Sequence, residues 1–329
     1  MLSFTPDGPD LLTIEAAAQE LAGRIVATPT LTLNTARLAH RLPESADVHM
    51  KLELFQQAGS FKARGVLLAI DAMSNAEKEA GVTAVSAGNH ALATAWGAGN
   101  AGLSAKVVMM KSADPVRVAG CEALGAEVVL ADDVTAAFET VEQLVRDEGR
   151  TMLHPFESPY MTLGAATCGL ELARAVEHLD VAIIPVGGGG LLSGMATAIR
   201  RLFPDCKVIG VEPFGADSLF RSFETGAPVH LDGVNTIADS LGAPMSLPDS
   251  FAIARSHVDR IIRIEDDLMR QTMKDMLDAL KLLAEPACAA SLAAACGPLK
   301  AELEGKQVGV IACGSNIGLE KFSALLSAQ

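Results

Sequence analysis

Short runs of apolar, often β-branched residues alternate along this chain with longer alanine-rich segments whose apolar positions repeat with a helical period. A short run of this kind is typical of a strand buried on both faces, and the longer segments are typical of the helices that cover it. Strands and helices that alternate at this spacing favour parallel sheets, because each parallel pair needs a crossover connection. The pattern therefore predicts an α/β fold.

The predicted elements extend over most of the chain. In the first half, they are strands at residues 82–86, 106–110 and 126–130 and helices at 91–99, 116–124 and 134–148. In the second half, they are strands at 181–186, 207–212 and 307–312 and helices at 162–179, 191–202, 271–283 and 287–303.

The composition adds a size and a charge to this picture. The chain has 329 residues, of which 50% are hydrophobic, 20% charged and 4% aromatic. This length and apolar content are enough for a large core divided over two lobes. The formal net charge of −14 disfavours binding to nucleic acid or to an anionic membrane.

Targeting signals and metal motifs are not predicted. The N-terminal segment MLSFTPDGPD has neither a basic start nor an apolar run, which disfavours a signal peptide. No segment reaches the roughly 18 uninterrupted apolar residues of a membrane span. The cysteines form no C-x-x-C pair, which disfavours a zinc or redox motif and favours a reducing cytoplasm. They are Cys121, Cys168, Cys206, Cys288, Cys296 and Cys313.

Two segments that lie far apart in the sequence carry complementary chemistry. In Gly59–Gly65 (GSFKARG), Lys62 has neighbours that are unusual for an ordinary charged surface. The segment Gly187–Gly194 (GGGGLLSG) follows an apolar strand and opens a helix, where backbone N–H groups and the helix dipole can bind a phosphate. A lysine amine that forms a Schiff base and a phosphate-binding loop are together what an enzyme needs to hold pyridoxal 5′-phosphate.

Each of these segments also has another interpretation. Lys62 could be a solvated surface lysine, as most lysines are. The glycine loop, followed 22 residues after Gly190 by Glu212, has the layout of a dinucleotide-binding unit. The glycine spacing disfavours this, because G-x-G-x-x-G would place its third glycine at Leu192 or Ser193. A non-enzymatic protein that binds an NAD-type ligand is the corresponding alternative.

Four segments resemble the signature blocks of the serine/threonine dehydratase branch of the fold-type II pyridoxal-phosphate enzymes, to which serine racemases are also related. In the order of that family, they are Ser60–Gly65, Ser86–His90, Gly187–Leu191 and Cys313–Asn316. The resemblance implies a two-lobed α/β fold similar to that of the tryptophan synthase β chain, with a largely parallel sheet flanked by helices in each lobe. It implies a small lobe at residues 52–148, inserted in a large cofactor-binding lobe of residues 1–51 and 149–329. We also expect a homodimer or homotetramer.

The resemblance assigns roles to individual residues. It implies that Lys62 forms the Schiff base with the cofactor and later removes the Cα proton of the substrate, while Phe61 packs against the pyridine ring. It also implies that Asn89 binds the 3′-oxygen of the cofactor and that Cys313 faces the pyridine nitrogen. The phosphate would be held by Gly187, Gly188, Gly189, Gly190 and Leu191.

The segment Ser86–His90 lies between a predicted strand and a predicted helix. The simpler interpretation is an ordinary helix cap formed by Ser86 or Asn89. The resemblance implies instead that the segment binds the α-carboxylate of an amino-acid substrate. Ala87 stands where serine racemases of the family carry a serine that acts as an acid and base, which disfavours racemisation. We give His90 no catalytic role. The residues of this substrate-binding segment are Ser86, Ala87, Gly88, Asn89 and His90.

Glu212, Ala216 and Ser218 resemble a site for Mg²⁺ or another cation that part of the family carries. In that site, a glutamate, a backbone carbonyl and a second acid bind the ion. Ser218 replaces the second acid, so the site offers one charge fewer than a hard cation prefers. The favoured interpretation is therefore a Glu212 carboxylate that caps the end of a strand.

The resemblance implies a pyridoxal-phosphate-dependent dehydratase, or ammonia-lyase, that converts a β-hydroxy-α-amino acid into a 2-oxo acid and ammonia. A thiol at Cys313 cannot fully protonate the pyridine nitrogen, which suits rapid β-elimination better than long-lived carbanions. A racemase or a β-replacement enzyme with the same cofactor is the alternative. Serine, threonine, a hydroxyaspartate and a phenylserine share the reacting atoms. Arg221 is a candidate partner for the second carboxylate of a dicarboxylic substrate.

Overall fold

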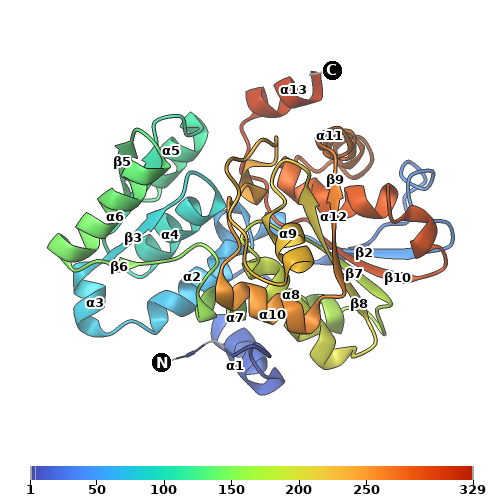
Figure 1. Cartoon of the computed structure of the whole chain (residues 1–329), viewed down its shortest axis with the longest axis horizontal. Coiled ribbons are helices and arrows are strands. Elements are labelled where there is room, and N and C mark those ends of the chain that lie inside the picture. The colour runs from blue at the N-terminus through green and yellow to red at the C-terminus, as the bar shows by residue number, and fades with distance from the viewer. Residues whose placement is uncertain (1, 4, 328–329) are drawn as a thin grey trace.

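Two α/β lobes lie side by side in the structure, a computed structural model that describes residues 2–3 and 5–327. Figure 1 shows the small lobe on the left and the large lobe on the right. The helices α2 (Lys62–Asp71) and α7 (Pro159–Arg174) pack against each other near the junction. This arrangement confirms the predicted fold class.

Within the described residues, the large lobe contains a six-stranded sheet with the order β1–β2–β10–β7–β8–β9. Its strands are β1 (Thr30–Thr32), β2 (Asp47–Lys51), β7 (Val181–Pro185), β8 (Lys207–Pro213), β9 (Arg260–Ile264) and β10 (Gln307–Ile311). The edge strand β1 is antiparallel to β2, and the other pairs are parallel. In the centre, Ile183 lies opposite Ile209 on one side and Val310 on the other. All of β7 is buried, as expected for a parallel sheet covered on both faces.

The small lobe contains a four-stranded parallel sheet with the order β5–β4–β3–β6. Its strands are β3 (Val82–Val85), β4 (Ala105–Met110), β5 (Glu127–Ala131) and β6 (Thr151–Met152). The strand β6 belongs to this small sheet, although it follows residue 148, where the sequence prediction ended the inserted lobe. The exact domain boundaries stay a prediction.

Helices cover the sheets of both lobes. The small lobe contains α3 (Asn75–Ala80), α4 (Asn89–Asn100), α5 (Pro115–Ala123) and α6 (Val134–Glu148). The large lobe contains α1 (Leu11–Leu21), α8 (Gly190–Leu202), α9 (Ser218–Thr225), α10 (Pro248–His257), α11 (Asp266–Asp275), α12 (Pro286–Cys296) and α13 (Leu319–Ser327). Short 3₁₀ turns span Glu53–Phe55, Gln57–Gly59, Asp239–Leu241 and Lys300–Leu303, and Met276–Leu280 is a π-helical turn. None of the helices in the described ranges has the length and hydropathy to cross a membrane.

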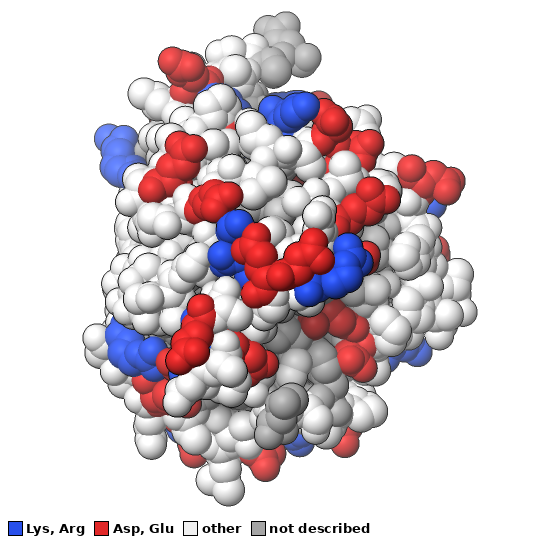
Figure 2. All heavy atoms as spheres, turned by 90° about the vertical axis from the view of Figure 1, so that its left-hand side faces the viewer, with Lys and Arg blue, Asp and Glu red and all other residues white. Residues whose placement is uncertain are grey.

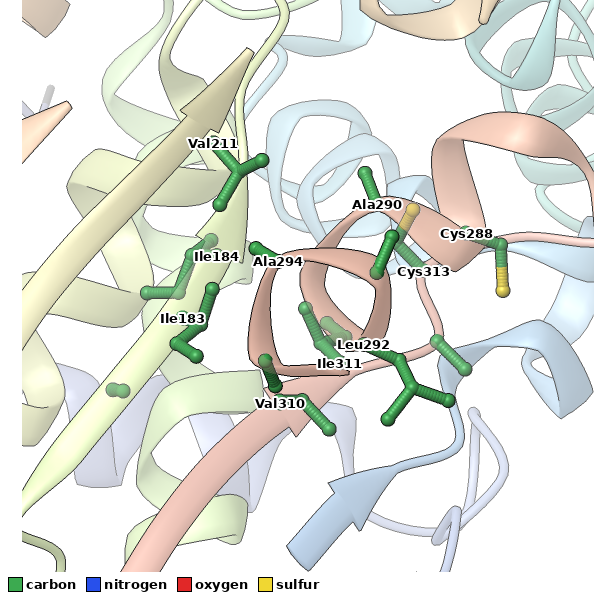
Figure 3. Packing of buried hydrophobic residues seen from close by; sticks show 14 of the residues in the cluster. Ile183, Ile184, Val211, Cys288, Ala290, Leu292, Ala294, Val310, Ile311 and Cys313 are labelled. Carbon is green, nitrogen blue, oxygen red and sulfur yellow. The ribbon is translucent and has the colours of Figure 1, made fainter. Parts of the chain in front are cut away.

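The helix α12 is buried on every side in the core of the large lobe. Figure 3 shows it packed beside Ile183 and Ile184 of β7 and Val310 and Ile311 of β10. Its sequence, PACAASLAAAC, consists mostly of small residues, which allow a helix and a sheet to approach closely. The same packing brings the N-cap residue of α12, Glu285, to the end of β10.

Most predicted elements are confirmed within two residues of their ends, and the helix at 134–148 is confirmed without change. Three helix predictions are wrong in their bounds. The helix predicted to reach residue 179 ends at Arg174, and the helix predicted at 271–283 begins at Asp266 and becomes a π-helical turn. The helix predicted at 287–303 stops before Gly297, where an added Cβ would lie 2.7 Å from the Leu268 side chain. Gly297 itself leaves the helical conformation, with a φ of −117° and a ψ of −110°.

The carboxyl ends of β2, β10 and β7 lie side by side, because these strands are neighbours in the large sheet. The segments that follow them lead to Lys62, Cys313 and Gly187 respectively. In open α/β sheets, ligands bind outside the carboxyl ends of the strands where the order of the strands changes direction. The topology therefore brings together three of the four segments singled out from the sequence, and the fourth follows β3 of the small sheet.

Candidate active site

Lys62 is the first residue of α2 and directly follows a turn that pairs with the end of β10. Ser60 and Gly314 form an isolated antiparallel bridge, and the Phe61 N–H donates to the Cys313 carbonyl over 3.3 Å. This pairing brings Lys62 close to Cys313, although the two residues lie 251 positions apart in the sequence.

The amine of Lys62 lies against a carbonyl and an aromatic ring. Lys62 Nζ donates to the Pro155 carbonyl and lies 4.9 Å from the centre of the Phe61 ring. Burial lowers the pKa of Lys62 to about 8, and the neighbouring Cys313 opposes this only in part. A desolvated lysine with such a pKa supplies the neutral amine that acts as a nucleophile and a base.

A buried ionic network ties the start of α2 to the large lobe. The Arg64 side chain is fully buried and donates to both carboxylate oxygens of Glu53 and of Glu171 over 2.7–2.8 Å. Lys51 also pairs with Glu171 over 2.7 Å. Paired guanidinium and carboxylate groups of this kind fix relative orientation, because each contact has two parallel hydrogen bonds. The position of Lys62 is therefore set from the large lobe.

The predicted phosphate loop lies between β7 and α8. Gly189 is the N-cap of α8 and has a φ of 94°, a conformation that favours glycine. Within residues 2–3 and 5–327, the N–H groups of Gly187 to Leu191 donate to no protein acceptor. An added Cβ at Gly188 would lie 2.2 Å from the Phe156 ring, so the loop has no room for a side chain there. Unpaired N–H groups at a helix N-terminus form a phosphate-binding cradle.

The segment before α4 also presents unpaired N–H groups. In the described part of the chain, no side chain caps α4, because the Ser86 hydroxyl instead accepts from the Gly88 N–H over 3.2 Å. The helix-cap interpretation is therefore wrong. The N–H groups of Ala87, Asn89 and His90 likewise find no acceptor among the described residues. This arrangement can bind a carboxylate, as predicted.

Hydrogen bonds fix the orientation of the Asn89 carboxamide. Asn316 Nδ2 donates to Asn89 Oδ1 over 2.7 Å, and Asn89 Nδ2 donates to Glu285 Oε1. The second Asn89 Nδ2 hydrogen has only a long contact of 3.5 Å with the Ser240 hydroxyl. One N–H of Asn89 is therefore available to a ligand, which fits its predicted contact with the cofactor.

Two histidines border the site, of which His90 is buried and His154 is half-buried. His90 Nε2 contacts the Leu153 carbonyl over 2.8 Å, and burial together with the Lys62 charge lowers the pKa of His90 to about 3. His154 Nδ1 accepts from the Glu157 N–H over 2.8 Å, and the same two causes lower the pKa of His154 to about 4. Both rings are therefore neutral, which supports a packing role for His90.

Cys313 lies buried at the end of β10, where Figure 3 shows it beyond Ile311 and near α12. Burial raises the pKa of Cys313 well above its usual range, so the thiol is neutral. A neutral thiol is a weak hydrogen-bond partner for a pyridine nitrogen. The contact of Cys313 with the cofactor stays a prediction.

The candidate cation site does not fit a hard cation. Both carboxylate oxygens of Glu212 accept backbone N–H groups, from Leu219 over 3.0 Å and from Phe220 over 2.7 Å. Burial raises the pKa of Glu212 to about 8. Ala216 and Ser218 are buried beside it. The described residues contain no group of three or more His, Cys, Asp or Glu side chains that could hold a metal. Glu212 therefore caps the start of α9, whereas the simpler interpretation had it cap the end of a strand.

The acid next to this site is already neutralised by two arginines. Asp217 pairs with Arg221 over 2.8 Å and with Arg263 over 3.0 Å. The Arg263 guanidinium lies 4.8 Å from the Phe214 ring centre and 3.9 Å from that of Phe220. Arg221 on α9, the candidate partner for a second substrate carboxylate, is thus already paired with Asp217.

Three residues of the site were not singled out from the sequence. Phe156 supports the phosphate loop, and Arg117 and Glu285 surround the Asn89 amide. Phe156 carries a weak signal, as an aromatic residue in a chain that is poor in them. Arg117 and Glu285 are charged residues near helix starts, which usually indicates solvated positions.

The sequence of residues 23–314 matches the family described as “Pyridoxal-phosphate dependent enzyme”. The chain belongs to this family. Membership confirms the recognised resemblance and the predicted cofactor, and it decides against the NAD-type alternative. The geometry fits the cofactor, because a desolvated amine, a side-chain-free N–H cradle and an oriented amide border one site. The individual residue roles stay predictions.

Similar proteins agree with this assignment. The chain is 46% identical to phenylserine dehydratase of Ralstonia pickettii over 315 residues, which cover 96% of this chain and 95% of the relative. It is 35% identical to L-threo-3-hydroxyaspartate ammonia-lyase of Saccharomyces cerevisiae over 303 residues, covering 92% and 91%. The structure of maize serine racemase superposes with a TM-score of 0.89 at 30% identity and covers 96% of both chains. These matches confirm the fold-type II architecture.

Proposed function

We propose that this pyridoxal-phosphate-dependent lyase acts on a β-hydroxy-α-amino acid with an uncharged β-substituent, and that phenylserine is such a substrate. The products are a 2-oxo acid and ammonia. The choice of an uncharged β-substituent rests on one observation. The basic side chains near the Ser86–His90 loop already form ion pairs with carboxylates of the protein. The 46% identity to a phenylserine dehydratase supports the same choice.

The basic side chains at the loop have protein partners. Arg117 pairs with Asp239 over 2.9 Å and with Glu285 over 3.4 Å. Lys321 pairs with Asp239 over 2.9 Å. A second substrate carboxylate, as in a hydroxyaspartate, would compete with these acids for the cations Arg117 and Lys321. It would also lose its own hydration, which costs free energy. A neutral aryl group has no such requirement.

The residues of the site divide the chemistry among them. Pyridoxal phosphate, once bound, supplies the electron sink that makes the Cα proton of an amino acid removable. Lys62 holds the cofactor and accepts this proton on Nζ, because its lowered pKa leaves neutral amine available near pH 8. The N–H groups of Ala87, Asn89 and His90 hold the α-carboxylate and so direct Cα–H toward Lys62. The β-hydroxyl leaves as water, and hydrolysis of the released enamine gives the 2-oxo acid and ammonia.

The features around Ala87 and Cys313 support elimination over racemisation. Alanine has no proton to deliver to the face of Cα opposite Lys62. The neutral Cys313 thiol leaves the cofactor a moderate electron sink, which favours prompt loss of the β-hydroxyl.

A substrate panel tests the proposal on the holoenzyme. Phenylserine, serine, threonine and threo-3-hydroxyaspartate are assayed separately, and both 2-oxo acid and ammonia are quantified. We expect the highest kcat/KM for phenylserine and the lowest for hydroxyaspartate. Lys62→Ala should give neither product and lose the borohydride-trappable cofactor, whereas the exposed-site control Lys111→Ala should match the wild type. A preference for hydroxyaspartate, or wild-type turnover by Lys62→Ala, would contradict the proposal.

We further propose that the chain forms a homodimer or homotetramer in a reducing cytoplasm. All six cysteines lie in the described residues and are free and buried, which supports a reducing compartment. Leu31 on the edge strand β1 and Phe55 are exposed apolar residues, which supports contact with another copy. Figure 2 shows acidic and basic side chains interspersed on the small-lobe side, which supports the expectation that nucleic acid is not a partner. Light scattering on the purified protein tests the assembly.

A further inference from the structure

The guanidinium of Arg117 joins the small lobe to the large lobe. Its Nε donates to the Asn316 carbonyl over 2.9 Å. Its Nη1 donates to the Ala87 carbonyl over 3.3 Å and to Asp239 over 2.9 Å, and its Nη2 donates to Asp239 over 3.3 Å and to Glu285 over 3.4 Å. These contacts use all five donors of the group. The side chain is only 6% exposed, so this is a buried junction.

Glu285 links this junction to the Asn89 amide. Its carboxylate is fully buried, with one oxygen bound to Asn89 and the other to Arg117. Glu285 belongs to the start of α12 in the large lobe, whereas Asn89 and Arg117 belong to α4 and α5 in the small lobe. Gly314 allows this approach, because an added Cβ there would lie 2.6 Å from Glu285 Oε1.

We propose that Arg117 and Glu285 are positioning residues that aim the free N–H of Asn89 at the cofactor, and that they do so only while the small lobe is docked on the large lobe. The proposal rests on the pyridoxal-phosphate site described above. Neither residue touches the reacting atoms. Their effect passes through Asn89, whose orientation changes if Glu285 loses its charge or its place.

The electrostatics of the junction support this coupling. Glu285 faces Arg117 from α5, Asp239 from the turn before α10, Asn89 from α4, and the neutral thiols Cys288 and Cys313. Burial raises the pKa of Glu285 to about 7, and Arg117 is the cation that opposes this rise. Without Arg117, the carboxyl group protonates, and its neutral form is a weaker acceptor for the Asn89 N–H. Separation of the lobes would remove the Asn89 and Arg117 contacts of Glu285 at once, because both residues belong to the small lobe.

The test compares two arginine variants of the small lobe in the holoenzyme. Arg117→Lys keeps the charge but not the fork of five donors. Arg150→Lys is the matched control, because Arg150 is also buried and its contacts, with Glu148, Val82 and Ser104, stay within the small lobe. Cofactor content, thermal unfolding and the visible absorption of the bound cofactor are measured first, without substrate. The kcat and KM for phenylserine follow.

We expect Arg117→Lys to retain its fold and its covalently held cofactor, to shift the absorption maximum of that cofactor, and to lower kcat by about 10- to 100-fold with a smaller change in KM. Arg150→Lys should change the thermal midpoint and leave the spectrum and kcat unchanged. Glu285→Gln, which keeps the shape and removes the charge, should reproduce the spectral shift. Guanidinium ion should partly restore the wild-type spectrum of Arg117→Ala.

A purely structural role for the junction predicts a different result. Arg117→Lys and Glu285→Gln would then lower the thermal midpoint while their spectra and kcat stayed at wild-type values, and this outcome would overturn the proposal. The spectral measurement needs no substrate. A wild-type enzyme that fails to release oxo acid therefore counts against the proposed function alone and leaves the positioning test intact.

Discussion

Lys62 differs from an exposed lysine because its amine is desolvated while it stays within reach of a ligand. The lowered pKa of about 8 means that the neutral form makes up about one tenth of the amine at pH 7 and about nine tenths at pH 9. We therefore expect covalent capture of pyridoxal phosphate by the apoprotein to accelerate from pH 7 to pH 9 and then to level off.

Borohydride trapping at timed intervals measures this rate, with Lys62→Ala as the background. A free lysine derivative, measured in parallel, corrects for the titration of pyridoxal phosphate itself. A rate that follows the free amine and keeps rising beyond pH 10 would show that the site does not perturb Lys62.

We expect Ala87 to influence what happens to the Cα proton of the substrate after it is removed. Its side chain offers no acid, and its backbone carbonyl is held by Arg117. We expect wild-type enzyme to form 2-oxo acid well in excess of D-amino acid, and Ala87→Ser to raise the D-product. Chiral chromatography measures both, and Ala101→Ser, an exposed position at the end of α4, is the control. Comparable amounts of D-amino acid and oxo acid from the wild type would point to another proton donor.

At the scale of elements, the phosphate loop combines an unusual backbone with unpaired N–H groups. Gly189 has a φ of 94° and Gly226, the C-cap of α9, has a φ of 76° with open space where a Cβ would stand. Alanine costs about 1–2 kcal/mol of conformational strain at either position. We expect Gly189→Ala and Gly226→Ala to lower the unfolding free energy of the apoprotein similarly. Only Gly189→Ala should weaken pyridoxal-phosphate binding, as measured by equilibrium dialysis. Equal affinities would place the phosphate elsewhere.

The connection from β8 to α9 leads to a prediction about divalent cations. Glu212 caps α9, and two arginines neutralise Asp217. We expect prolonged treatment with EDTA to leave both the thermal midpoint and kcat of the holoenzyme unchanged, and added Mg²⁺ to have no effect. A loss on chelation that Mg²⁺ restores would show that these residues rearrange around an ion.

The sequence predicted some of the secondary-structure elements and some residues of the candidate site, and it missed others. The helix at 134–148 and the central strands follow from local patterns of apolar residues, because each such element is stabilised largely by burying its own apolar face. The stop before Gly297 was missed although Gly297 and Pro298, a pair that usually ends a helix, stand there in the sequence. Lys62 and the glycine loop were predicted because their residue types are rare in such settings. Arg117 was not, since nothing near it in the sequence reveals that acids from the other lobe surround it.

At the scale of the whole molecule, the two lobes contribute different parts of the site. The large lobe holds the glycine loop, Cys313 and, through Arg64, the start of α2. The small lobe contributes the segment Ser86–His90 and Arg117. The alternation of strands and helices does not show this division, because both lobes have the same pattern along the chain; only the family resemblance implied two lobes before the strand order was known.

The side chain of Arg64 binds Glu53 and Glu171, which anchors the start of α2 independently of the segment from α3 to α6. Because Lys62 lies before that segment, we expect that residues 74–150 can be replaced by the corresponding segment of a relative that prefers another amino acid, provided that Asn89 and Arg117 are kept. We expect such a chimera to inherit the donor's ranking of substrates by kcat/KM and to retain the recipient's dissociation constant for pyridoxal phosphate. A chimera whose cofactor affinity follows the donor would show that the anchor is shared. We therefore expect that a new substrate preference can arise by recombination of a single internal segment while Lys62 and its anchor stay unchanged.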